Sequence, residues 1–382
     1  MRDRVFYPRL ESLRGVAAFV VLVHHAAGAT GVLQDTALPK SVFIPAMIWA
    51  TLLHGGAAVM LFFVLSGFVM GLNIDLTRGL TARLFAEFIL RRILRLYPVV
   101  FVSIAFAIVI FHYIGGRHFS LDETVDLLLV RAIDVNPPLW SIKVEAAVSV
   151  IYPFLLLVVV RGGNSARGLI LPVAISCYFM GYGPQMILLY LIAFVLGLLI
   201  PYLGKDLMAE LGSRGSLLLL PVAVCAYSSG AIVGYYQLLP PSPAMFLQIF
   251  GAFYLVAFVI AWGDRIGWLE QTPLRFLGHI SFSLYALHYP IIIGVTALFT
   301  HLSFWPQRAM ILLTSVPLSL LVAAAASRFV EQPFQRLGRI LAPMRPTGPP
   351  AVMAALPRLH EVARPVAEAI NQRGSQGSLR NP

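Results

Sequence analysis

Long apolar runs recur along almost the whole chain, and short polar segments separate them. Ten windows of about 20 residues are apolar enough to cross about 30 Å of hydrocarbon as a helix. The pattern therefore predicts an all-α fold class, a polytopic membrane protein with about ten transmembrane helices. The predicted spans are 12–32, 52–73, 96–115, 139–160, 168–183, 184–202, 216–237, 243–262, 280–301 and 308–329.

The positions of the basic residues predict which side of the membrane each loop faces. Lys and Arg accumulate in cytoplasmic loops, and an N-terminus inside places most of the 28 Lys and Arg residues on that side. An even number of spans then puts both the N- and the C-terminus in the cytoplasm. The outer loops hold few basic residues, namely Lys40, Arg117, Arg131 and Arg308.

The composition is typical of a protein surrounded by lipid and argues against a soluble domain. The chain is 59% hydrophobic and only 12% charged, with a mean hydropathy of +0.82, whereas soluble domains carry about 25% charged residues. The net charge of +11 follows from the basic inner loops, so we expect no nucleic-acid partner. The two cysteines lie in apolar runs without metal-ligand spacing, and we expect no metal site. The first apolar run continues into a full span, which argues against a cleavable signal peptide.

The first predicted span contains ionisable residues, which are costly in a bilayer and often functional. Arg14 and His25 are eleven residues apart, so on a helix they face the same way, roughly 16 Å apart along the axis. His24 points about 80° away from Arg14 by the same helical geometry. A catalytic histidine and a hydrogen-bonded packing histidine are equally compatible with this spacing.

Two further spans carry polar stripes. Ser141 and Glu145 lie one turn apart near the start of the fourth span, where a carboxylate needs a partner or a proton. A polar contact between helices is the alternative role for Glu145. In the ninth span Ser281, Tyr285 and His288 follow one stripe, and Pro290 just beyond it predicts a local kink.

A cluster of arginines precedes the third predicted span. Arg91, Arg92 and Arg95 are expected at the inner membrane face. Ordinary anchoring to anionic lipid explains such a cluster, and position alone favours that explanation. A clamp for phosphate groups is the sharper hypothesis.

These residues fall within a series of motifs that resembles one family. The sequence is similar to the acyltransferase-3 family of membrane acyltransferases, whose members include bacterial O-acetylases of surface polysaccharide. The resemblance covers roughly residues 5–335, and its strength lies in six motifs that occur in the family's order. The motifs are LESLRG with the two following histidines, LFFVLSGF at 61–68, RRILRLYP at 91–98, LWSIKVE followed by Pro153, ISFSLYALHYP, and VEQPF at 330–334.

The resemblance implies acyl transfer from an acyl-coenzyme A, with acetyl-coenzyme A as co-substrate and no other cofactor. The acceptor would be a hydroxyl group of a carbohydrate or a lipid-linked glycan, and the location a bacterial inner membrane. His25 is then expected as the general base, with a covalent acyl-histidine as an alternative. The remaining expected roles are catalytic for Arg14 and Glu145, acyl-coenzyme A binding for Arg91, Arg92 and Arg95, and acceptor contact or support for Ser66, Ser141, Tyr285 and His288.

Two other function classes remain open from the sequence. Buried His, Glu and Arg in ten spans also fit a transporter or flippase. An inactive membrane scaffold of the same fold is the second alternative, because Met60 stands where relatives often have a polar residue and the aromatic pair usual after Glu145 is missing. The predicted organisation is a membrane domain over 1–335 and a largely disordered cytoplasmic tail over 336–382, with the oligomeric state open.

Overall fold

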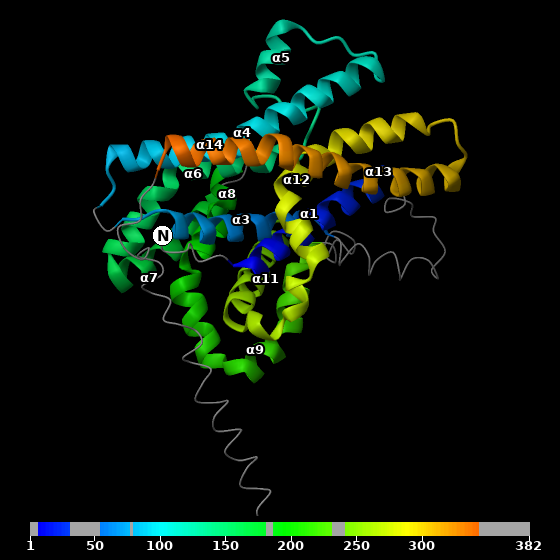
Figure 1. Ribbon diagram of the computed structural model, residues 1–382. Coiled ribbons are helices and arrows are strands. Elements are labelled where there is room, and N and C mark those ends of the chain that lie inside the picture. Colours follow the sequence, from blue (N-terminus) through cyan, green and yellow to red (C-terminus); the bar gives the residue numbers. More distant parts are fainter. Residues whose placement is uncertain (1–6, 31–53, 77–78, 181–185, 231–240, 344–382) are drawn as a thin grey trace, which may run out of the picture.

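The computed structural model describes residues 7–30, 54–76, 79–180, 186–230 and 241–343 (Figure 1). Within these residues every regular element is a helix. The boundary between the predicted spans 168–183 and 184–202 and most of the predicted tail lie outside the described residues. The helices are α1 (Pro8–Ala29), α3 (Gly55–Asn73), α4 (Ala82–Tyr113), α5 (Leu121–Leu128), α6 (Leu139–Arg161), α7 (Gly163–Met180), α8 (Met186–Leu199), α9 (Lys205–Tyr227), α11 (Pro241–Trp262), α12 (Thr272–Leu298), α13 (Phe304–Ala326) and α14 (Gln332–Leu341).

Eight helical runs in the described part of the chain are long and apolar enough to cross a membrane. One of them, Ile187–Tyr227, has 41 residues and contains both α8 and α9. The backbone of Gly212 is not helical (φ 60°, ψ −177°) and breaks this run between two of the predicted spans. The all-α polytopic prediction is confirmed, and the predicted number of ten spans is approximate.

The outer surface of the bundle is apolar. Leu218, Leu313, Leu321 and Phe329 each expose 70% or more of their surface. Soluble monomers rarely expose large contiguous apolar patches, whereas lipid tails cover such side chains without cost. Together with the long apolar helices, this surface identifies a multi-pass membrane protein.

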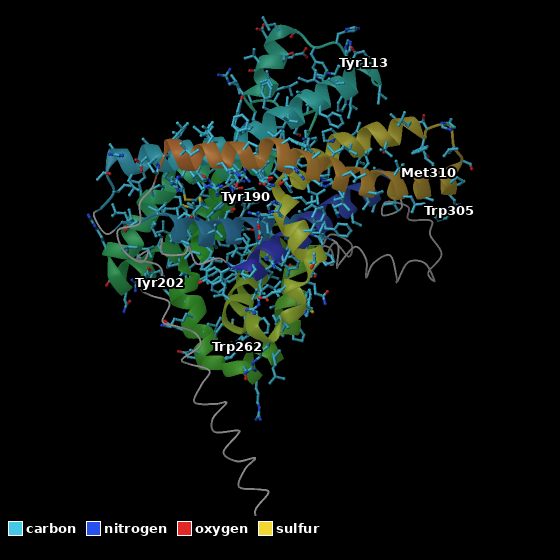
Figure 2. All side chains as sticks on the ribbon, in the orientation of Figure 1. Tyr113, Tyr190, Tyr202, Trp262, Trp305 and Met310 are labelled. Atoms are coloured by element: carbon cyan, nitrogen blue, oxygen red, sulfur yellow. The ribbon has the colours of Figure 1, made fainter. Side chains whose placement is uncertain are left out.

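Aromatic side chains lie near helix ends on opposite sides of the bundle (Figure 2). Tyr113 ends α4 and Trp305 begins α13, at ends predicted to face outside. Tyr202 and Trp262 follow α8 and end α11, at ends predicted to face inside. Tyr and Trp are enriched at both membrane interfaces because one part of the ring is apolar and another part is polar.

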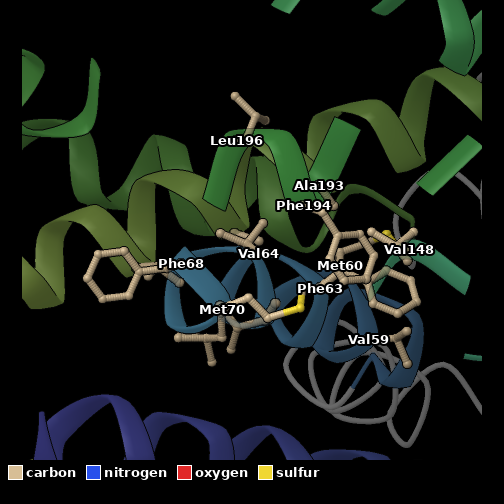
Figure 3. Close-up of a cluster of buried hydrophobic side chains, with 14 of the residues drawn as sticks. Val59, Met60, Phe63, Val64, Phe68, Met70, Val148, Ala193, Phe194 and Leu196 are labelled. Carbon is tan, nitrogen blue, oxygen red and sulfur yellow. The ribbon is translucent and has the colours of Figure 1, made fainter. Parts of the chain in front are cut away.

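A cluster of buried apolar side chains lies where α3 packs against α8 (Figure 3). A Cβ atom on Gly67 would lie well within 3.0 Å of the Phe194 backbone, and one on Gly197 would meet the carbonyl of Val64 as closely. Small residues let transmembrane helices approach in this way. Met60 packs in this core and is only 3% exposed, so at this position the side chain fills space between helices.

The gap that Pro290 leaves in the hydrogen bonding of α12 is filled by side chains from two other elements. Proline has no N–H, so the carbonyl of Ala286, four residues earlier, has no helical donor. Ser103 Oγ donates to this carbonyl at 2.6 Å and Asn136 Nδ2 donates at 2.9 Å. Asn136 is fully buried and also donates to Ser103. The segment before α6 is thereby tied to α4 and α12.

The arginine cluster lies inside a helix and not in a loop between two helices. Helix α4 is continuous over 32 residues from Ala82, which places Arg92 about 15 Å from its inner end. Its partner Glu145 lies in α6, six residues after Leu139 at the predicted outer end. The cluster thus precedes the predicted third span within one continuous helix, and its expected position at the inner membrane face stays a prediction.

Candidate active site

Helices α1 and α12 run side by side and in the same direction. A Cβ atom on Gly15 would lie well within 3.0 Å of the Gly278 backbone, so the two glycines allow close contact between the helices. Arg14 Nε donates to Ser281 Oγ at 2.8 Å. Farther along both helices, the rings of His25 and His288 are in contact. The polar faces predicted separately for these two helices thus meet at two levels. Arg14 contacts Ser281 at the lower level, and His25 contacts His288 at the upper level.

The upper level is a pair of histidines. His25 Nδ1 lies 3.0 Å from the carbonyl oxygen of Val21 and 3.1 Å from His288 Nε2. His288 is fully buried, and its Nδ1 lies 2.7 Å from the carbonyl oxygen of Tyr285. A carbonyl oxygen only accepts hydrogen bonds, so the His25 proton belongs on Nδ1. His25 Nε2 then carries the lone pair, and His25 itself is half-buried.

The neighbouring histidines form a second group around the start of α3. The ring of His24 lies edge-on to His25 at 5.5 Å and to His54 at 5.8 Å between centroids. His54 caps α3 by accepting from the backbone N–H of Ala57, and its Nδ1 also lies 3.2 Å from Gln248 Nε2. The sequence analysis missed His54, and its position directly before two glycines was the available signal.

The lower level contains an ion pair between α4 and α6. Arg92 donates to the Glu145 carboxylate and, through Nε, to Ser149 Oγ at 3.0 Å. Ser66 of α3 donates to the same carboxylate oxygen at 3.1 Å. The side chains of Arg92 and Glu145 are only 12% and 16% exposed. Glu145 thus joins three helices through its contacts with an arginine and a serine.

Arg95 lies at the same level, within electrostatic range of Arg14, Arg92, Glu145 and Glu331. Among the described residues it has no hydrogen bond or salt bridge with an acceptor. Three arginines and two glutamates leave this level with an excess of one positive charge. A buried excess charge is costly unless an anion pairs with it.

Glu331 is a buried carboxylate that the sequence analysis did not single out. It accepts from Ser283 Oγ at 2.6 Å and from Gln335 at 2.9 Å, and it is 4% exposed. It ends a π-helical segment, Ser327–Glu331, a feature that is frequent at functional sites. The motif VEQPF contained this residue, but its partner on α12 is 48 positions away.

The three arginines of the predicted clamp point to different neighbours. Arg91 Nε donates to the carbonyl oxygen of Ala342, just after α14, at 2.6 Å. Arg92 is paired with Glu145. Within this group Arg95 is therefore the guanidinium best placed to meet an added anion, together with Arg14 across from it.

Ser141 and Tyr285 lie beside the histidine pair on another side. Their hydroxyl oxygens are 2.6 Å apart, and both lie within hydrogen-bond distance of the carbonyl oxygen of Pro138. The ring of Tyr285 lies 5.8 Å from that of His288. Ser141 therefore connects α6 to α12, although its neighbour Glu145 connects α6 to α4.

The two levels are about 16 Å apart along α1. His25 lies about 6 Å from the end of α1 that is predicted to face outside, whereas Arg14 lies about 9 Å from the other end. A cavity of about 570 Å³ lies at that other end, lined by Glu11, Thr272, Arg275, Phe276 and His279. It touches neither histidine of the pair.

Comparisons with known proteins place the chain in a family. A family model described as an acyltransferase domain, that of the acyltransferase-3 family, matches residues 7–328. The comparisons with curated proteins and with solved structures found no match. The match covers most of the 382 residues, including both histidines of the upper level and the three arginines of the lower level. The chain therefore belongs to the acyltransferase-3 family, and it is a multi-pass membrane acyltransferase.

Proposed function

We propose that this acyltransferase moves an acetyl group from acetyl-coenzyme A to a hydroxyl group of a carbohydrate or lipid-linked glycan. The observation that carries this proposal is the position of the His25 ring. Its Nδ1 faces the Val21 carbonyl and His288, which leaves Nε2 as a hydrogen-bond acceptor. A neutral imidazole with a free nitrogen is suited to take a proton from a hydroxyl group.

The reaction needs only His25 as a proton carrier. Nε2 takes the proton of the acceptor hydroxyl while the hydroxyl oxygen attacks the thioester carbonyl carbon. The carbon–sulfur bond then breaks, and the coenzyme A sulfur leaves with the electron pair. Nε2 returns the proton to this sulfur, so the products are an O-acyl ester and coenzyme A thiol. Each turnover restores the neutral histidine.

The lower level supports an anionic donor. Arg95 and Arg14 lie close together and supply an excess positive charge, which donor phosphates would balance through charge-assisted hydrogen bonds. The distance of about 16 Å from Arg14 to His25 is similar to the reach of an extended pantetheine arm. Glu145 then acts indirectly, because its contact with Arg92 keeps that arginine in place.

The upper level supports an uncharged, hydroxyl-bearing acceptor. The polar groups beside the histidine pair include the hydroxyls of Ser141 and Tyr285, which suit another hydroxyl better than a charged group. His25 lies close to the end of α1 predicted to face outside, so we expect the acceptor to approach from the outer face and the donor from the cytoplasm. The bilayer location we propose is a bacterial inner membrane.

The test is transfer of labelled acetyl groups by the protein in proteoliposomes. Acetyl-coenzyme A labelled in the acetyl group is supplied on one side, with an extract of lipid-linked glycans. We expect coenzyme A thiol to be released and label to appear in glycan as an alkali-labile ester. Transport of label without thiol release would contradict acyl transfer and support a transporter. Thiol release with label in a protein or an amine would retain the acyltransferase but overturn the proposed acceptor.

A further inference from the structure

The His25 imidazole has two acceptors at the same nitrogen. Nδ1 lies 3.0 Å from the Val21 carbonyl and 3.1 Å from His288 Nε2. The Val21 carbonyl already accepts the backbone N–H of His25 in the helix, so it offers the ring a shared bond. His288 offers a separate lone pair, provided that its own proton lies elsewhere.

The surroundings of His288 determine where its proton lies. Nδ1 of His288 is within 2.7 Å of the Tyr285 carbonyl and 3.2 Å of the Leu284 carbonyl. Both are acceptors, so the proton belongs on Nδ1 and Nε2 carries the lone pair. The side chain is fully buried, which disfavours a second proton and a positive charge. His288 thus presents an acceptor to His25.

We propose that His288 is a positioning residue that holds the proton of His25 on Nδ1. The opposite tautomer of His25 would direct three lone pairs, from Nδ1, the Val21 carbonyl and His288 Nε2, at one another. His288 therefore keeps Nε2 of His25 unprotonated and fixes the plane of its ring. The consequence for the reaction rests on the function proposed above, because Nε2 is the atom that takes the acceptor proton there.

This role differs from direct contact with the acceptor, which the sequence had suggested for His288. The atom that would make such a contact, Nε2, is occupied by His25, and the other nitrogen faces the backbone of its own helix. The Ala286 carbonyl, which lacks a helical donor because of Pro290, accepts from Ser103 and Asn136, two residues before His288. These bonds hold the helix in the position from which His288 reaches His25.

The direct test is the 15N spectrum of protein labelled at histidine, in detergent or nanodiscs. Protonated and unprotonated ring nitrogens give separate signals, and a His25→Gln variant assigns those of His25 among the nine histidines. In the unaltered protein we expect His25 protonated at Nδ1, with a coupling across the hydrogen bond to His288 Nε2. Protonation at Nε2, or absence of that coupling, would overturn the proposal. This test needs neither a variant at His288 nor activity.

Variants then separate positioning from mere packing. In His288→Leu we expect a mixture of His25 tautomers and a kcat lower by about 10- to 100-fold, as for other residues that orient a catalytic histidine, with the KM for donor unchanged. His288→Gln keeps an acceptor oxygen near the Nε2 position, and we expect it to restore most of kcat. His279→Leu, on the same helix, is the control.

Equal losses of kcat in His288→Leu and His288→Gln would contradict the positioning role. A pure Nδ1–H tautomer of His25 in His288→Leu would contradict it as well. If the unaltered protein transfers no acyl group, the proposed function fails. The 15N spectrum of His25 then still tests this inference, because it does not depend on activity.

Discussion

Arg14 Nε donates a hydrogen bond of 2.8 Å to Ser281 Oγ, and this contact aligns two parallel helices. From it, α1 and α12 continue until His25 meets His288. The positions of these two levels depend on how closely the helices approach. Gly15 and Gly278 allow that approach, because neither has a side chain between the two backbones.

Adding one methyl group at this crossing should disrupt the site. In Gly15→Ala the new Cβ would lie well within 3.0 Å of the Gly278 backbone, and backbone cannot move aside as a flexible side chain can. We expect a lower Tm and loss of acyl transfer, measured on protein purified in detergent. Gly28→Ala on the same helix is the control, since its Cβ would meet nothing within 4 Å. Equal Tm values for the two variants would show that the helices are not in close contact.

The buried ion pair should contribute far more to stability than an exposed one. Arg92→Met leaves the Glu145 carboxylate buried without its cation, and such a change costs about 3–5 kcal/mol. Arg83→Met on the same helix breaks an ion pair of the exposed Arg83 with Glu87, for which little or no loss of stability is expected. Thermal unfolding in detergent measures both. If Arg92→Met lowers Tm no more than Arg83→Met, Arg92 does not pair with Glu145 in the bundle.

Arg95 should affect donor binding more than folding. It has no acceptor among the described residues and lies near Arg14 at a level with excess positive charge. We expect Arg95→Gln to raise the KM for acetyl-coenzyme A by about tenfold or more, the loss of one charge-assisted hydrogen bond, with little change in Tm. Calorimetric titration with coenzyme A checks the binding independently. An unchanged affinity, with Arg83→Gln as the control, would exclude Arg95 from the donor site.

The bond from Asn136 to Ala286 should matter only while Pro290 is present. Asn136→Ala removes one of two donors to the Ala286 carbonyl, and we expect a loss of about 1–2 kcal/mol. Pro290→Ala supplies the missing helical N–H. In the Asn136→Ala background, Pro290→Ala should therefore recover part of the Tm. A further decrease in the double variant would mean that Asn136 stabilises the protein through another contact.

The sequence predicted the polar stripes within single helices, because these depend only on 3.6-residue periodicity. Arg14 and His25 do share one face of α1, and Ser281 and His288 do share one face of α12. Which polar faces meet depends on where the helices cross. Glycines such as Gly15 and Gly278 allow these crossings, and their contact partners lie far away in the sequence. The pairing of His25 with His288 therefore required the structure.

Two differences between the sequence analysis and the structure have the same physical origin. The predicted span begins at residue 96, after the start of helix α4 at Ala82, because Arg91, Arg92 and Arg95 lower the local hydropathy, although the carboxylate of Glu145 offsets part of that charge. Glu331 was not singled out because a lone glutamate after an apolar run resembles a helix end at the membrane surface. In both cases the ion or hydrogen-bond partner comes from a distant segment, and hydropathy along the chain contains no information about it.

The central claim is that His25 is the base of an acyl transfer, and the most direct test compares two adjacent histidines. Coenzyme A thiol release is measured for the unaltered protein, His25→Ala and His24→Ala, with acetyl-coenzyme A and a glycan extract. We predict a rate about 10²- to 10⁴-fold lower in His25→Ala, the usual loss of a general base, and a rate close to that of the unaltered protein in His24→Ala, with similar Tm values. Full activity in His25→Ala would contradict the claim, as would equal losses in the two variants.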